Sequence, residues 1–320
     1  MLRSLSLSSL TTRFRPVLAR LAADDFILPH WSSLEAAPNG NGKGTAPEGA
    51  LSPWKADTAP RDIVAAGQTA TPLGALLSPS QVRTFLDCSA RWWYKYGLGL
   101  PDPPGASLVR GKALHRVAEA YFRARIAGAS PEPEDLAEVF EVSWEECCSD
   151  AVFREDDDVE ELKKQTAILA RKYLDEVARE IKPAAVETPV SGKIGGVPVR
   201  GIVDLIDEEG RIIDLKTAGR KPSGVSPDYR LQLASYRLLA PGASGKVRLD
   251  TIVATKAPQV VTLAFDIEEK DVRMAEILYP HVREGIREGL FFPNRGSNLC
   301  SRRNCPFADA CEGDFGGRVE

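Results

Sequence analysis

Two aspartates interrupt stretches of the sequence that are otherwise apolar. Asp204 ends the stretch 197–204, and Asp214 follows two isoleucines. A buried carboxylate is costly unless a metal ion or another cation neutralises it. Lys216 lies two residues after Asp214, so on a strand both side chains point to the same face, and a hairpin can place Asp204 beside them. Two carboxylates and an ammonium in this arrangement could hold Mg²⁺ or Mn²⁺ and hydrolyse a phosphodiester.

Taken alone, Asp-x-Lys is a weak signal, because an ion pair at the exposed end of a strand has the same pattern. Gln232 and Tyr236 are four residues apart, so on a helix they share one face and could reach the acidic site. The alternative is a polar flank on a packed helix. His115 lies in an apolar helical stretch and is a candidate third metal ligand, although a lone helical histidine is more often structural.

The elements expected around these residues define an α/β fold. A helix is expected to begin with Ser80 as its N-cap, and apolar periodicity predicts helices over 109–127, 134–149 and 156–181. The pattern then changes to a three-stranded meander over 185–194, 197–206 and 211–217. It is followed by a helix (228–240), strands (247–255 and 260–265) and a helix (268–289) that Pro280 could kink. This order predicts a mixed sheet.

In this order and on these elements, the candidate residues resemble the RecB-type branch of the PD-(D/E)XK nucleases. The matching motifs are His115, Gly201-x-x-Asp204, Asp214-x-Lys216 and Gln232-x-x-x-Tyr236. The resemblance covers roughly residues 78–311. It implies a restriction-endonuclease-like mixed sheet flanked by helices, with a helical insert and a C-terminal cysteine loop.

The resemblance also implies a role for each residue. The implied metal ligands are His115, Asp204, Asp214 and the backbone carbonyl of Leu215. Lys216 would be the catalytic lysine, and Gln232 and Tyr236 would orient it and the DNA strand. Glu187, on the first strand, would be an accessory acid.

Four cysteines form a second constellation. Cys88 precedes the predicted sheet, and Cys300, Cys305 and Cys311 follow it. Structural zinc sites usually show paired short spacings, which are absent here. One cysteine before and three after the core is similar to AddB-type helicase–nuclease subunits and CRISPR-adaptation nucleases, which implies a [4Fe-4S] cluster. The four residues between Cys300 and Cys305 exceed the commonest family spacing, so zinc and free thiols remain alternatives.

Basic residues near these motifs are candidates for contacts to the DNA backbone. They are Arg91, Arg220, Lys221, Arg302 and Arg303. Arg91 begins a segment in which basic and aromatic residues alternate, which suits phosphates and unpaired bases, although packing of its tryptophans is the alternative. No element that would read bases is evident, so low sequence specificity is expected.

Composition narrows the class of protein. The 320 residues carry 41 basic and 45 acidic side chains, which gives a net charge of −4. This excludes a protein that binds nucleic acid through a high overall positive charge. No apolar stretch is long enough to span a bilayer. Six cysteines are too few for a disulfide scaffold and fit a reducing compartment.

The chain is expected to divide into a low-complexity tail (1–76), a nuclease domain (77–315) and a short tail (316–320). Residues 1–23 contain four arginines and no acid, as organellar transit peptides do. A bacterial tail or an upstream start codon is the simpler interpretation, so a cytoplasmic location is expected, with an organellar one as the alternative.

The sequence therefore predicts a Mg²⁺- or Mn²⁺-dependent DNA nuclease, an exonuclease acting on single strands or ends in repair, recombination or phage DNA processing. One alternative is a CRISPR-adaptation nuclease that trims prespacers. The other is a catalytically silent DNA-binding subunit of a helicase–nuclease complex. No Walker motif is present, so a helicase partner would be a separate protein.

Overall fold

The computed structural model describes residues 73–320, so nearly all of the predicted N-terminal tail lies outside the described residues. Five strands form one sheet in the order β1-β2-β3-β4-β5. They are β1 (Pro183–Ile194), β2 (Val197–Asp207), β3 (Ile212–Ala218), β4 (Lys246–Val253) and β5 (Gln259–Asp266). β3 and β4 are parallel and the other neighbours antiparallel, which confirms the predicted mixed sheet.

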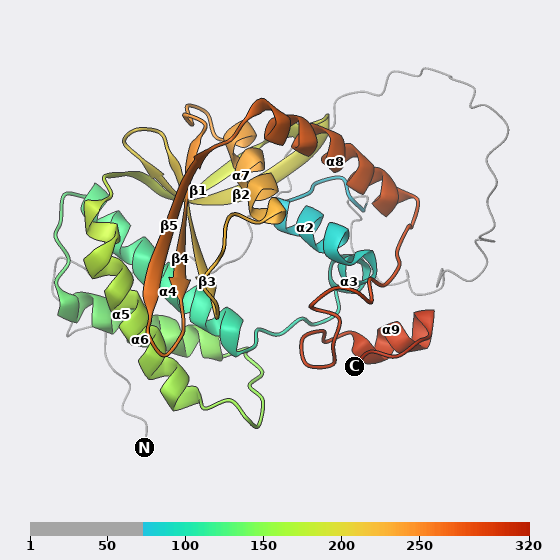
Figure 1. The fold of residues 1–320 in the computed structure, drawn as a ribbon, viewed down its shortest axis with the longest axis horizontal. Helices are drawn as coiled ribbons and strands as arrows, with labels where there is room; N and C mark the ends of the chain where they lie inside the picture. Colours follow the sequence, from blue (N-terminus) through green and yellow to red (C-terminus); the bar gives the residue numbers. More distant parts are fainter. Residues whose placement is uncertain (1–72) are drawn as a thin grey trace, which may run out of the picture.

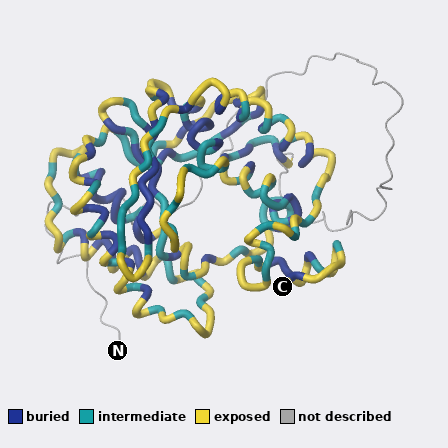
Figure 2. Tube along the Cα trace, in the orientation of Figure 1, coloured by how far each residue is buried: buried dark blue, intermediate teal, exposed yellow. Residues whose placement is uncertain are grey.

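Helices cover both faces of this sheet (Figure 1). On one face, α4 (Ala106–Ile126) packs against the strands, and α5 (Pro133–Cys148) and α6 (Val159–Glu176) pack against α4. On the other face lie α7 (Pro227–Leu239) and α8 (Glu269–Arg287), together with α2 (Pro79–Asp87). Figure 2 shows buried residues running along the middle strands and along the helix sides that face them.

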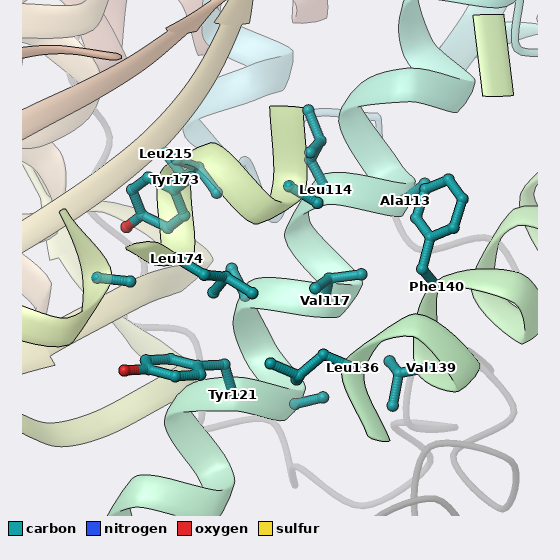
Figure 3. Close-up of a cluster of buried hydrophobic side chains, with 14 of the residues drawn as sticks. Ala113, Leu114, Val117, Tyr121, Leu136, Val139, Phe140, Tyr173, Leu174 and Leu215 are labelled. Carbon is teal, nitrogen blue, oxygen red and sulfur yellow. The ribbon is translucent and has the colours of Figure 1, made fainter. Parts of the chain in front are cut away.

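The core under α4 decides which way the side chains of β3 point. Figure 3 shows Val117 and Tyr121 of α4 among apolar residues of α5 and α6, and Leu215 of β3 belongs to the same cluster. Neighbouring strand residues face opposite sides of a sheet. Since Leu215 faces α4, Asp214 and Lys216 face α7.

The sheet opens between β2 and β3. Only two residue pairs join these strands, Leu205 with Ile213 and Ile206 with Ile212. Beyond them β2 continues along β1, while β3 continues along β4. Asp204 and Asp214 are the first residues past the last pair, so both lie where the two strands separate.

The C-terminal cysteine loop packs with α2, α3 (Ser89–Trp92) and a π-helical turn (Trp93–Gly97). It contains α9 (Ala308–Phe315), a helix that the sequence analysis did not predict. The last residues also fold onto this loop, since Val319 is buried and the Glu320 carbonyl accepts the Arg302 N–H at 2.7 Å.

Several predicted helix ends differ from the structure by a few residues. Ser78, rather than Ser80, is the N-cap of α2, because its Oγ accepts the Gln81 N–H at 3.2 Å and Pro79 suits the first helical position. α6 ends at Glu176, earlier than expected, and a 3₁₀ turn (Ala178–Glu180) leads into β1. Within residues 73–320, no helix has both the length and the apolar character needed to cross a membrane.

Two neighbouring glycines in the β1–β2 turn allow the packing of this turn against α8 to be tested. Gly195 (φ +56°) and Gly196 (φ +78°) both adopt left-handed conformations. A Cβ on Gly195 would lie 2.3 Å from the Glu276 carbonyl oxygen, whereas one on Gly196 would meet nothing within 4 Å. We expect Gly196→Ala to lower the free energy of unfolding by about 1–2 kcal/mol, and Gly195→Ala by about 2–4 kcal/mol, in urea titrations. Equal losses would contradict the close approach of α8.

Candidate active site

Asp214 is the centre of a polar cluster between β3 and α7. Its Oδ2 atom lies 2.7 Å from Lys216 Nζ, and its Oδ1 atom accepts a hydrogen bond from Gln232 Nε2 at 3.2 Å. Gln232 Nε2 also donates to the Tyr236 hydroxyl at 3.1 Å. Of the two α7 residues expected to reach back to the acidic site, Gln232 contacts Asp214 directly, and Tyr236 contacts Gln232.

Burial and charge act together on this cluster. Burial raises the pKa of Asp214 to about 6, against the opposing effect of Lys216 and with a further increase from Asp204. Burial by itself disfavours the ammonium of Lys216, but Asp214 and Asp204 outweigh it, so the pKa of Lys216 lies above its ordinary value. At neutral pH, Lys216 is therefore a cation.

Asp204 holds the two strands together at the point where they separate. Its Oδ2 atom accepts the backbone N–H of Leu215 at 2.9 Å, which takes the place of a ladder hydrogen bond. Because a carboxylate has about four acceptor positions, Asp204 keeps capacity for a cation. The same oxygen lies 3.7 Å from His115 Nδ1.

His115, on α4, presents its ring to Asp204 and to Leu215. Its Nε2 atom lies 2.8 Å from the Leu215 carbonyl oxygen, which can only accept, so in this arrangement Nε2 carries the proton. Nδ1 then faces Asp204 with its lone pair when the ring is neutral.

Glu187 completes a group of three metal-ligand candidates. One ligand atom each from His115, Glu187 and Asp204 lies within 4.8 Å of the other two. Burial raises the pKa of Glu187 to about 8, and the charges of Asp204 and Glu119 add to the effect. Glu187 also has φ +45°, a conformation that L-residues rarely adopt and that occurs often at functional sites.

The residues that lie together as metal-ligand candidates in the structure differ from the expected set. The accessory acid Glu187 lies in the three-residue group, whereas the Asp214 carboxylate is turned toward Lys216 and Gln232. The donor set of a histidine nitrogen, two carboxylates and the nearby Leu215 carbonyl fits a divalent cation such as Mn²⁺ or Mg²⁺.

Glu119 is a site residue that sequence reasoning missed. It is buried and lines the same pocket as His115 and Glu187. Arg123 Nε lies 2.8 Å from Glu119 and offsets its charge. The signal was present in the sequence, since Glu119 is four residues after His115 and shares its helix face.

The four expected cysteines line one cavity. They are Cys88, Cys300, Cys305 and Cys311. The Asn294 N–H donates to Cys88 Sγ at 3.5 Å, and Arg295 Nη1 donates to Cys300 Sγ at 4.0 Å. Arg91 also lines the cavity, and its buried Nη1 atom has no hydrogen-bond partner in the described part of the chain.

The expected DNA-contact residues differ in their surroundings. Arg220 and Lys221 are exposed, and no ion pair joins them to other residues between 73 and 320. Arg302 pairs with Asp309 and Glu312, and Arg303 pairs with Asp156. Arg91 lies 3.7 Å from Asp102, and its side chain is only 17% exposed.

Comparison with known proteins identifies the family. The model of the PD-(D/E)XK nuclease superfamily matches residues 76–312. The chain belongs to this superfamily. The match spans both strand-borne aspartates, the α7 residues and all four cysteines of the cavity. Membership of the superfamily means that the protein is a nuclease, without specifying its substrate or its metal.

Solved structures give weaker likenesses. A "Putative exonuclease" from Eubacterium rectale is 15% identical, with a TM-score of 0.47 and coverage of 75% of this chain and 88% of its own. SSO0001 is 13% identical, with a TM-score of 0.33 and coverage of 74% and 96%. Both TM-scores are below 0.5, so neither likeness gives information about the activity of this nuclease. No curated protein matches the chain.

The raised pKa of Glu187 predicts how stability depends on pH. The folded state binds this proton more tightly than the unfolded state, so the free energy of unfolding falls as pH rises from about 4.5 to about 8. Glu187→Gln removes this fall. We expect the variant to match the wild type at pH 5 and to exceed it by about 2 kcal/mol at pH 8.5, in urea titrations with EDTA. The same difference at both pH values would refute the assignment.

Proposed function

We propose that this protein is a metal-dependent DNA nuclease that acts as an exonuclease on single strands or strand ends. The observation that carries the proposal is that Asp204, on the α4 side, and the ion pair of Asp214 and Lys216, on the α7 side, lie where β2 and β3 separate and influence one another's charge. Membership of the PD-(D/E)XK superfamily supports phosphodiester hydrolysis at this place. The domain that performs it is proposed to span residues 77–315.

The proposed cofactor is Mg²⁺ or Mn²⁺. His115, Glu187, Asp204 and the Leu215 carbonyl would hold it, and Asp214 is the neighbouring carboxylate that the family resemblance adds to them. When bound, such an ion polarises the scissile phosphate and lowers the pKa of a water molecule.

The lysine and the α7 residues have separate roles in this proposal. Because Asp214 and Asp204 keep Lys216 protonated, its ammonium stabilises the negative charge that develops on the phosphate rather than removing a proton. Gln232 fixes the Asp214 carboxylate from the other side, and Tyr236 fixes Gln232. Arg220 and Lys221, exposed just beyond β3, are placed to contact the DNA backbone.

Cleavage of labelled single-stranded DNA with Mn²⁺ tests the site. Asp214→Ala and Lys216→Ala should each lower kcat by at least about 100-fold, since each removes a charge at the reacting phosphate. The matched controls are Asp266→Ala and Lys246→Ala, a charged pair of facing residues on β5 and β4 of the same sheet. The controls should cleave as the wild type does. Wild-type rates in Asp214→Ala and Lys216→Ala would refute the site, and a wild-type protein that binds DNA without cleaving it would favour the silent-subunit alternative.

We further propose that the cysteine cavity holds a [4Fe-4S] cluster. The spacing of the sulfur atoms supports the cluster over zinc. No three of the described sulfur atoms lie within 4.8 Å of one another, whereas tetrahedral zinc would bring them to about 3.8 Å. The unpaired Arg91 Nη1 and the Arg295 guanidinium supply positive charge for an anionic group bound by thiolates.

The proposed cluster gives the purified protein a measurable colour. We expect broad visible absorption and about four iron atoms and four sulfides per chain. Cys305→Ser should bleach the protein and lower its melting temperature, because the cross-link between distant segments is weakened. The matched control is Cys147→Ser, a half-buried thiol on α5 outside the cavity, which should keep the colour. A colourless protein that contains one zinc per chain would overturn the proposal.

Repair, recombination and phage DNA processing remain the proposed settings. Unassisted cleavage of ordinary single strands would support a general exonuclease, and dependence on a separate helicase would indicate a subunit of a helicase–nuclease complex.

A further inference from the structure

The ring of Tyr229 lies beside the lysine of the proposed active site. Tyr229 is in the first turn of α7, and its ring centroid is 5.4 Å from Lys216 Nζ. The guanidinium of Arg83, on α2, lies 5.3 Å from the same centroid. Both distances are within the range in which an aromatic face attracts a cation.

Lys216 needs a second restraint besides Asp214. Its ammonium ends a flexible stem of four methylene groups, and Asp214 contacts it from within the same strand. The ring of Tyr229 approaches from α7, a different element, and Lys216 is only 20% exposed, so the attraction is weakly screened by water. Together the carboxylate and the ring restrict where the charge can lie.

Arg83 connects this contact to the cysteine region. It lies 3.1 Å from Asp228, the residue before Tyr229, and its guanidinium also lies over the ring. Its helix, α2, ends at Asp87, and the next residue, the C-cap Cys88, lines the cysteine cavity. The helix that precedes Cys88 therefore also contacts the residue that faces Lys216.

We propose that Tyr229 is a positioning residue for Lys216, and that the contact of Arg83 on α2 holds its ring in place. This inference rests on the proposed nuclease function. Tyr229 acts through the lysine rather than through the substrate, and its ring rather than its hydroxyl performs this role.

The test compares variants that keep or remove the ring. Tyr229→Leu should lower kcat by about 3- to 10-fold with KM unchanged, whereas Tyr229→Phe should stay within 2-fold of the wild type. Phe265→Leu is the matched control, because it removes a ring that lies 4.8 Å from the Arg230 guanidinium on the same face of the sheet but away from Lys216. The control should keep the wild-type kcat.

Several outcomes would overturn the inference. They are an unchanged kcat in Tyr229→Leu, a rise in KM instead of a fall in kcat, and a loss in Tyr229→Phe as large as in Tyr229→Leu. If Tyr229→Leu does not fold, judged by its melting temperature, Tyr229→Met replaces it with the same expectations.

A second readout does not depend on cleavage. Acetic anhydride labelling followed by peptide mass spectrometry should modify Lys216 at least 3-fold faster in Tyr229→Leu than in Tyr229→Phe. Equal labelling would overturn the inference. An inactive wild-type protein that still shows the labelling difference would refute the proposed nuclease function while leaving the contact between Tyr229 and Lys216 supported.

Discussion

The hydrogen bond from the Leu215 N–H to the Asp204 carboxylate is the contact on which the site depends. It forms where β2 and β3 stop pairing, so a side chain replaces the missing ladder partner. An unsatisfied buried N–H would cost about 1–3 kcal/mol, and Asp204 removes that cost while remaining at the open edge. The separation of the strands thus provides the space for a site, and the same carboxylate supplies part of its charge.

The charged residues in this opening form two neighbouring groups. Asp214 lies with Lys216 and Gln232 on the α7 side, while Glu187 and Asp204 lie with His115 on the α4 side. Without a bound cation, the second group carries more negative than positive charge, and this repulsion adds to burial, the main cause of the raised pKa of Glu187. A divalent cation would relieve this repulsion. Metal binding would therefore offset the free-energy cost of placing two carboxylates close together in a partly buried site.

The cysteine region connects segments that are far apart in the sequence. Trp92 and Trp93 stack on Phe291, and Ser89 exchanges hydrogen bonds with Phe292, so helix α3 and the segment after α8 pack together. These contacts bring Cys88 close to the loop that carries the other three cysteines. A cross-link over so long a loop would constrain the unfolded chain strongly.

The sequence alone determined the sheet, its helical layers and the aspartates on β2 and β3, because apolar periodicity and interrupted strands are local signals. It also indicated that Gln232 would reach the acids, since helical spacing fixes which residues share a face. Only the tertiary structure decided that Glu187 joins His115 and Asp204, that Arg91 faces the cysteine cavity, and where the two strands separate. These depend on how strands pair and helices pack across long distances in the chain, which no local pattern of residues encodes.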